Sequence, residues 1–254
     1  LGMIDIPAFT PYSTMILSPN INNLSRLKRE KYKYIFSEKL AEYFSKLNNF
    51  KSIAFNPEQI DMRPFLWFNY HKEEGFKFNV EPRYTARIYF KNQSKKSIFK
   101  NFTKGRKSDL KKAYGLELQK SIDLSEIFTI YKRTFIRQNI NIDDSNFEKF
   151  KNIIKYSFSP FKSVIYSSKD KLGNTNAFVY FLMSNNSAYY LFGSSSDKGR
   201  ECGALTFLIS SFLEECLSKD FDFIDFVGAN SPNRGDFKLS FGAKLLPYYK
   251  LSKK

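Results

Sequence analysis

Histidine and cysteine are scarce in this chain of 254 residues. It has one histidine, His71, and two cysteines, Cys202 and Cys216. A zinc cluster built from cysteine and histidine needs more ligands, so this class of site is excluded and we expect no metal. A Ser-His-Asp or Cys-His enzyme would have to use His71, and no acidic context around it suggests a triad. We expect both cysteines to be reduced thiols in a cytoplasmic protein.

Long apolar runs and a leader pattern are also lacking. No apolar run approaches the roughly 20 residues that a membrane span needs. The opening LGMIDIPAFTPYSTMIL (1–17) has no basic stretch followed by an apolar one, so we expect no signal peptide.

Apolar and basic residues are plentiful. Hydrophobic residues make up 42% of the chain and aromatic residues 18%, which indicates a folded core rather than disorder. Lys plus Arg number 41 against 25 Asp plus Glu, giving a net charge of +16. The stretch KNQSKKSIFKNFTKGRKSDLKKA (91–113) is the most basic. An anionic partner is expected, either nucleic acid, a phosphate-bearing metabolite or anionic lipid; a coding bias toward lysine is the alternative.

The second half of the chain predicts the element order β-α-α-β-β-β-α-β-α-β, an α/β fold with a mixed sheet. Strands are expected at 116–121, 162–168, 176–183, 187–195, 221–227 and 244–251. Helices are expected at 123–138, 144–157, 199–220 and about 232–241. The helix 199–220 has an apolar face that recurs at i, i+3, i+4 and i+7, formed by Leu205, Leu208, Ile209, Phe212, Leu213 and Cys216.

The first half contains a segment that is similar in sequence to a segment near the end of the chain. NFKSIAFNPEQIDMRPFLWFNY (49–70) aligns without gaps on DFDFIDFVGANSPNRGDFKLSF (220–241), and each follows an amphipathic helix. The alignment matches Arg63 with Arg234. We interpret it as an internal duplication, with chance similarity of two amphipathic segments as the alternative. The predicted domains are an incomplete half at 1–95, a basic linking helix at 96–113 and a complete domain at 114–254.

Four stretches carry a resemblance to known families. They are PRYTARIYF (82–90), KGRKSDLKKA (104–113), FGSSSDKGRECGA (192–204) and DFVGANSPNRGDFKLSFGAKLLPYY (225–249). Their order and spacing resemble the GNAT acyl-CoA N-acyltransferase fold. They also resemble its two-domain relatives, the Fem-type peptidoglycan aminoacyltransferases and similar bacterial sugar N-acyltransferases. The resemblance implies tandem GNAT-like domains, the first incomplete or degenerate.

The GNAT resemblance implies acyl-CoA as a co-substrate. A helix N-terminus offers free N–H groups and a positive dipole end to a diphosphate. The family pattern Arg/Gln-x-x-Gly-x-Gly/Ala is met by Arg200 and Gly203, whereas Leu205 departs from it. The residues expected to bind coenzyme A are Ser194, Ser195, Ser196, Gly199, Arg200, Gly203 and Ala204. The alternative is a glycine-tolerant helix start in a tight loop.

The resemblance also implies which residues perform catalysis. In GNAT enzymes the general acid is often a tyrosine in the last helix. Here that place holds Lys238, and Phe237-Lys238 fits the Fem type. Lys238 would stabilise a phosphate or the tetrahedral intermediate. Asp225, near the carboxyl end of a central strand, would orient or deprotonate the amine. A solvated lysine and a structural carboxylate are the alternatives.

Other candidates come from the residue types alone. Tyr248 is an alternative acid, and His71 a candidate base because its unperturbed pKa lies near neutrality. Trp67 and Tyr70 would stack on a sugar or base of the acceptor, although core aromatics are the alternative. The full set expected to bind the acceptor is Trp67, Tyr70, Asn230 and Arg234.

These observations lead to three functional hypotheses. The first is an N-acyltransferase that moves an acyl group from acyl-CoA to a nucleotide-linked amino sugar in surface polysaccharide biosynthesis. It expects a small anionic acceptor, no nucleic acid partner and no membrane span, and leaves a homodimer open. The second is a Fem-type aminoacyltransferase using aminoacyl-tRNA and a peptidoglycan precursor, suggested by the basic helix 95–113. The third is a non-catalytic nucleic-acid-binding relative, suggested by the missing tyrosine and by Val227, where many relatives have Glu.

Overall fold

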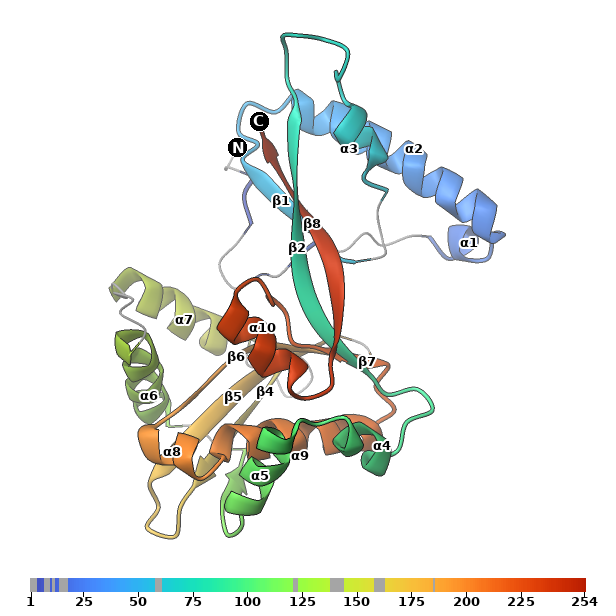
Figure 1. Ribbon diagram of the computed structural model, residues 1–254. Coiled ribbons are helices and arrows are strands. Elements are labelled where there is room, and N and C mark those ends of the chain that lie inside the picture. Colours follow the sequence, from blue (N-terminus) through green and yellow to red (C-terminus); the bar gives the residue numbers. More distant parts are fainter. Residues whose placement is uncertain are drawn as a thin grey trace. The chain divides into compact units, whose positions relative to one another are not determined.

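The chain forms two compact units, shown as a computed structural model in Figure 1. The first unit consists of Leu1–Thr85 and Leu246–Lys254, and the second of Ala86–Leu245. The residues that the structure describes are 4–6, 10, 12–13, 18–57, 61–120, 123–137, 144–157, 163–184 and 186–254. Strands β2 (Phe78–Tyr89) and β8 (Lys244–Lys253) each contribute residues to both units.

The first unit combines three helices with a small sheet. Its other elements are α1 (Pro19–Asn22), α2 (Arg26–Ser45), β1 (Ser52–Phe55) and α3 (Arg63–Trp67). Strand β8 lies between β1 and β2. Strand β1 runs antiparallel to β8, with Ser52 opposite Ser252 and Phe55 opposite Tyr249. The last residues of the chain therefore complete a sheet that begins near residue 50.

Aromatic rings form the core of the first unit. Helix α2 turns Ala41 and Phe44 inward, which are one turn apart and share a face. The ring of Phe44 stacks on that of Phe50 with centroids 4.8 Å apart. Phe65 of α3 meets Phe78 of β2 edge to face at 5.3 Å. Such contacts let a small unit bury much apolar area with few side chains.

The second unit is built on a mixed sheet. The strand order is β2-β7-β6-β5-β4-β3, and β6 and β7 form a parallel pair whereas the other described pairs are antiparallel. Its strands are β3 (Glu117–Gln119), β4 (Ser163–Lys169), β5 (Thr175–Ser184), β6 (Ser187–Ser195) and β7 (Phe223–Asp225). Its helices are α4 (Lys95–Lys100), α5 (Lys104–Lys112), α6 (Leu124–Arg137), α7 (Asp144–Ser157), α8 (Asp197–Glu201), α9 (Ala204–Ser218) and α10 (Pro232–Leu239).

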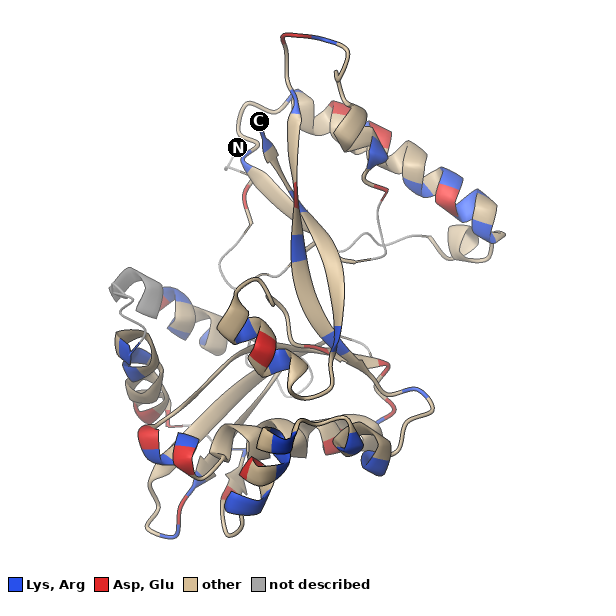
Figure 2. Ribbon diagram, viewed as in Figure 1, with Lys and Arg blue, Asp and Glu red and all other residues tan. Residues whose placement is uncertain are grey.

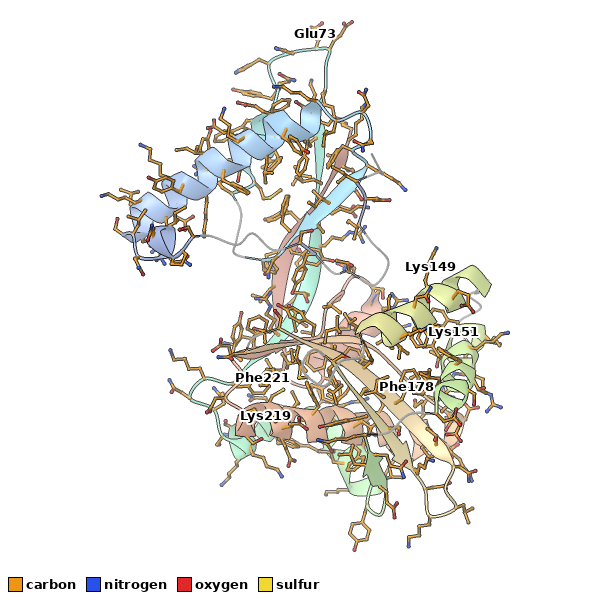
Figure 3. The ribbon with its side chains drawn as sticks, turned by 180° about the vertical axis from the view of Figure 1, so that it is seen from behind. Glu73, Lys149, Lys151, Phe178, Lys219 and Phe221 are labelled. Carbon is orange, nitrogen blue, oxygen red and sulfur yellow. The ribbon has the colours of Figure 1, made fainter. Side chains whose placement is uncertain are left out.

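Helices cover both faces of this sheet, so both faces of the central strand β5 carry buried apolar side chains. Side chains alternate along β5. Phe181 stacks on Phe212 of α9 with centroids 3.8 Å apart. Phe178, marked in Figure 3, lies near Tyr131 of α6, on the other face. Both phenylalanines are completely buried.

Helix α9 confirms the predicted apolar face. Leu208, Ile209, Phe212, Leu213 and Cys216 are all buried, and Leu205 packs against the same core. The predicted bounds of the strand 187–195 and of the helix 144–157 also agree with β6 and α7. Among the described helices, none combines the length and apolar character needed to cross a bilayer.

The predicted helix 199–220 is wrong at its beginning. The chain forms a short α8, breaks at Gly203, and only then starts α9. Gly203 has a φ of 71°, a left-handed conformation that interrupts a right-handed helix and favours glycine. The basic stretch 91–113 supplies two short helices, α4 and α5, and both lie in the second unit.

Candidate functional site

The carboxyl end of β7 carries a buried ion pair. Asp225 is the last residue of β7 and is 0% exposed. Its Oδ2 accepts a hydrogen bond from Nε of Arg87 at 2.6 Å, and Arg87 lies directly opposite on β2. Its Oδ1 accepts from the backbone N–H of Val227 at 2.7 Å. The carboxylate thus braces two strands and fixes the start of the turn that follows β7.

The turn after β7 presents two carbonyl groups to one lysine. Val227 and Gly228 have positive φ values of 45° and 31°, which aim successive peptide groups in unusual directions. Nζ of Lys238, on α10, donates to the carbonyl oxygen of Val227 and, at 2.7 Å, to that of Gly228. The lysine is 8% exposed. Lys238 is therefore a fixed amine inside the protein rather than a solvated surface lysine.

This environment makes the neutral form of Lys238 more abundant than it is for an ordinary lysine. Burial lowers its pKa to about 8, and the charge of Arg234 acts in the same direction, while Asp225 opposes it. About a tenth of the molecules then carry a neutral amine at pH 7. A neutral amine has two N–H donors and one lone pair. If the two carbonyls take both donors, the lone pair is available to accept a proton, as a general base requires.

The charge of Arg234 acts on both Lys238 and a buried phenol. Arg234 is exposed on α10, one turn before the lysine. Its charge also reaches Tyr131 of α6, where it opposes the burial that raises the pKa of that phenol to about 12. The sequence-predicted Asn230 follows the same turn and is exposed. Helices α6 and α10 therefore bring a phenol, a guanidinium and an amine toward one place.

The parallel pairing of β6 and β7 stops at the site. Its register runs over three pairs and ends where Tyr189 lies opposite Asp225. Strand β6 continues to Ser195, whereas the chain turns away after β7. Since Lys238 binds the turn that leaves β7, the amine lies where these two strands part. In α/β sheets, ligands bind at the carboxyl ends of strands where neighbours diverge.

The serines predicted to bind coenzyme A have partners within the chain. The hydroxyl of Ser194 is buried and donates to the carbonyl of Ile130 at 3.1 Å. The carbonyl of Ser195 accepts from Nη2 of Arg137 at 3.1 Å. The hydroxyl of Ser196 accepts from the N–H of Gly199 at 3.0 Å and caps α8. These contacts fasten the end of β6 to α6 and α8.

The glycines predicted to approach a diphosphate approach the chain's own backbone. A Cβ placed on Gly199 would lie 2.0 Å from the carbonyl oxygen of Asn176. One placed on Gly203 would lie 2.4 Å from the carbonyl oxygen of Asp109. Arg200 pairs with Asp197 on the surface of α8. Close packing within the protein thus accounts for both glycines.

Helix α5 covers the start of α9. The Asp109 carboxylate accepts from the hydroxyl of Thr206, in the first turn of α9, at 2.9 Å. Arg106 joins both, donating to that hydroxyl at 2.7 Å and pairing with the carboxylate at 3.0 Å. Ala204, the first residue of α9, is completely buried. An anionic side chain of the protein itself therefore already binds the first turn of α9, near the helix end that attracts anions.

Four sequence-predicted residues belong to the first unit. Trp67, at the end of α3, and Tyr70 are 52% and 59% exposed. His71 is exposed, and its ring lies 3.6 Å from that of Tyr70. Tyr248 is buried on β8 with its ring 5.4 Å from that of Tyr12. Within the described ranges, no three His, Cys, Asp or Glu side chains gather to form a metal site.

Sequence reasoning missed Arg87 and Tyr131. Arg87 stands in the apolar strand TARIYF (85–90), where a charged residue on a buried strand is a signal for an ion pair. Tyr131 had no such signal, because it follows the apolar spacing of α6 like any core aromatic residue.

Comparison with known proteins identifies the fold. No protein-family model and no curated protein matches the chain by sequence. The crystal structure of FemX matches with a TM-score of 0.62 and 15% identity, covering 85% of this chain and 75% of that one. A conserved protein of unknown function from Bacteroides thetaiotaomicron matches with a TM-score of 0.58 and 13% identity, covering 87% and 75%. A tandem GNAT protein from the clavulanic acid pathway has a TM-score of 0.47 at 9% identity, over 94% and 74%. The chain has a Fem-like fold.

Proposed function

We propose that this protein is a Fem-type acyltransferase that moves an aminoacyl group from aminoacyl-tRNA to an amine of a peptidoglycan precursor. The observation that carries the proposal is the Lys238 amine. It is buried where β6 and β7 part, it is held by two carbonyls, and its pKa is lowered to about 8. Burying a cationic amine costs free energy, and perturbed pKa values of this kind cluster at functional sites.

Lys238 would serve as the proton carrier of the reaction. The acceptor amine attacks the ester carbonyl of the donor, and a carbon–nitrogen bond forms. Lys238 takes the proton that the amine loses. The ester carbon–oxygen bond then breaks, and the lysine returns the proton to the departing ribose oxygen. General acid–base catalysis of this kind contributes typically 10²- to 10⁴-fold in rate.

Arg234 would stabilise the charge that develops during transfer. When the amine attacks, the carbonyl oxygen becomes an oxyanion, and a nearby cation lowers the energy of that state. Arg234 is exposed and lies close enough to lower the pKa of Lys238. Asp225 would be a positioning residue. Its hydrogen bond to the N–H of Val227 helps to fix the turn whose carbonyl groups hold the lysine.

The start of α9 supports an aminoacyl ester as donor over coenzyme A. A coenzyme A diphosphate at this helix start would meet the Asp109 carboxylate and the packing of α5 on Gly203. Like charges repel there, and the bonds that join Asp109, Thr206 and Arg106 would have to open. An aminoacyl ester of ribose does not need a diphosphate-binding site at this helix start.

A second candidate is an acyl-CoA-dependent N-acyltransferase acting on a nucleotide-linked amino sugar. Strand β6 supports it, because residues 190–195 extend beyond the last pair with β7 and so offer an edge to a pantetheine chain. Lys238 and Arg234 would have the same roles with a thioester.

The two candidates differ in the donor, so the donor is the test. The purified protein is incubated with radiolabelled aminoacyl-tRNA and a nucleotide-linked peptidoglycan pentapeptide, and separately with acyl-CoA and nucleotide amino sugars. We expect transfer in the first reaction and its loss in Lys238→Met. Transfer only from acyl-CoA, with coenzyme A binding seen by calorimetry, would establish the second candidate instead. Transfer in Lys238→Met at a rate close to that of the wild type would refute the role of the lysine.

A further inference from the structure

Half of the net charge of the protein lies in one short stretch. Residues 91–113 contain nine Lys and Arg residues and one acidic residue, Asp109, so they contribute +8 to the +16 of the chain. The stretch forms helices α4 and α5, which carry a concentration of basic residues in Figure 2. None of its lysines takes part in the contacts around Lys238 described above.

Helix α5 separates its charges by face. Arg106 and Asp109 face α9, where they bond to Thr206. Lys104, Lys107 and Lys111 follow one another at i, i+3 and i+7, so they share a face. All three are exposed. The helix thus packs through one side and presents a row of lysines on another.

This row is electrostatically unfavourable in the protein alone. Like charges three or four residues apart on a helix repel each other. Neither α4 nor α5 has an acidic residue in its first turn, although each has lysines there, against the helix dipole. In the described part of the chain, Lys104, Lys107 and Lys111 form no ion pair with a carboxylate. A bound polyanion would remove this repulsion.

The neighbouring apolar groups favour a nucleic acid over a lipid surface. A helix that binds a bilayer inserts exposed apolar side chains. Here Ile98 and Phe102 are turned into the core and are 3% exposed. The residue that does protrude is Tyr114, just after α5, which is 95% exposed. An exposed aromatic ring beside a basic row is suited to stack on a base while the lysines contact phosphates.

We propose that α4 and α5 form the docking surface for the sugar-phosphate backbone of the tRNA that brings the aminoacyl group. The docking surface consists of Lys96, Lys100, Lys104, Lys107 and Lys111, with Tyr114 beside it. This inference rests on the proposed function, because it assigns the RNA part of the same donor. It places recognition of the donor on a surface of the second unit that takes no part in the chemistry.

Binding of deacylated tRNA tests the surface without any need for catalysis. The dissociation constant is measured by fluorescence anisotropy between 50 and 200 mM KCl. Each phosphate contact contributes about 0.7 to 0.9 to the slope of log K against log salt. Lys104→Gln, Lys107→Gln and Lys111→Gln together should lower the slope by about 2 to 3 and weaken binding roughly tenfold or more at 100 mM salt.

The matched control removes the same charge elsewhere. Lys28→Gln, Lys31→Gln and Lys46→Gln change three exposed lysines of the first unit. We expect this variant to bind tRNA within about threefold of the wild type, because long-range charge is screened at this ionic strength. An equal loss of binding in both triple variants would overturn the inference, since it would mean that net charge alone attracts the RNA.

Tyr114→Ala separates stacking from charge. Its binding should weaken about tenfold while the salt slope stays unchanged, because stacking releases no counterions. Unchanged affinity would remove Tyr114 from the docking surface. Anionic vesicles are the contrasting probe: if the wild type binds them through Lys104, Lys107 and Lys111 and does not bind tRNA, the surface is a membrane contact and the inference fails.

The outcomes for surface and function are distinguishable. If the enzyme transfers aminoacyl groups but the lysine variant binds tRNA like the wild type, the docking surface is wrong and the proposed function stands. If tRNA binds through this surface but no donor supports transfer, the proposed function is wrong and the surface stands.

Discussion

The chain contains the same succession of elements twice, a helix, a strand and a short helix. The first copy is α2-β1-α3 and the second is α9-β7-α10. Both strands have an antiparallel neighbour, β8 for β1 and β2 for β7. The gapless match of 49–70 with 220–241 therefore agrees with a shared backbone plan.

The two copies differ in what they bury. In the second, Asp225 and Lys238 are buried and bonded to the turn after β7. The matching residues of the first copy are Ala54, which is buried, and Trp67, which is 52% exposed. The first copy forms its strand and helix without these polar groups. The shared arrangement of helix, strand and short helix thus forms in the first copy without them, which supports a role in function for the groups in the second copy.

The largest expected effect comes from removing the carboxylate of the second copy. Asp225→Ala leaves Arg87 charged and without this partner in a buried position, which costs about 3 to 5 kcal/mol of unfolding free energy. Ala54→Gly at the matching position should cost about 1 kcal/mol. Urea unfolding followed by circular dichroism measures both. A double variant, Arg87→Met with Asp225→Leu, should recover most of the loss, and equal costs at the two positions would contradict the contrast between the copies.

Lys238 and Trp67 provide the next contrast. Lys238→Met should lower kcat for acyl transfer about 100-fold, because the proton carrier is lost while the packing volume remains. Trp67→Met should leave kcat within about threefold, because an indole does not titrate and cannot act as a general acid or base. Initial rates at saturating substrate test both variants. A larger loss in Trp67→Met than in Lys238→Met would reverse the assignment of the active copy.

The starts of the long helices also differ. Helix α9 starts at Gly203, pressed on the backbone of Asp109, whereas α2 starts after an exposed Ser25. Gly203→Ala should cost about 2 kcal/mol or more, from both backbone strain and crowding. Gly173→Ala isolates the strain, because that glycine also has a positive φ but open space around it, and should cost about 1 kcal/mol. Thermal unfolding distinguishes the two variants. Equal losses of unfolding free energy would show that α5 shifts to accommodate the added methyl group.

The pH dependence should follow Lys238 alone. If its neutral form is the base, kcat/KM rises about tenfold per pH unit below pH 8 and levels off above it. Arg234→Gln removes a cation that lowers the pKa of Lys238, so the midpoint should move to higher pH. The Trp67→Met variant should keep the wild-type profile. A midpoint that does not move in Arg234→Gln would assign the titration to the substrate amine.

The same pKa has a consequence for stability. Between pH 8 and pH 10.5 the unfolded chain keeps a proton on Lys238 that the folded protein has released. The unfolding free energy contributed by this lysine therefore rises with pH over that window. Lys238→Met should lack this rise.

The smallest expected effect concerns the arginine that both copies share. Arg63 forms an exposed ion pair with Asp61, and such pairs contribute little to stability. Arg63→Gln should leave both the unfolding midpoint and the activity unchanged within error. Arg234→Gln should lower activity at pH 7. A loss of activity in Arg63→Gln would indicate that the first copy takes part in the reaction.

The sequence predicted the features that depend on local spacing. The apolar face of α9 and the bounds of β6 follow from side-chain periodicity, which operates over a few residues. The break at Gly203 could not be predicted in this way, because its cause is the backbone of Asp109 in a different helix. The pair of Arg87 and Asp225 joins residues 138 positions apart. The Lys238 position was found by resemblance, but its carbonyl partners depend on positive φ values that no local pattern indicates.

The position of β8 affects the order in which the protein can mature during synthesis. Strand β8 belongs between β1 and β2, so the sheet of the first unit has a gap until residues 246–254 have left the ribosome. The second unit is encoded between the two parts and has its own core, so it can fold earlier. The first unit is thus finished after the second, and a nascent chain that ends at residue 245 would expose the edges of β1 and β2 to aggregation.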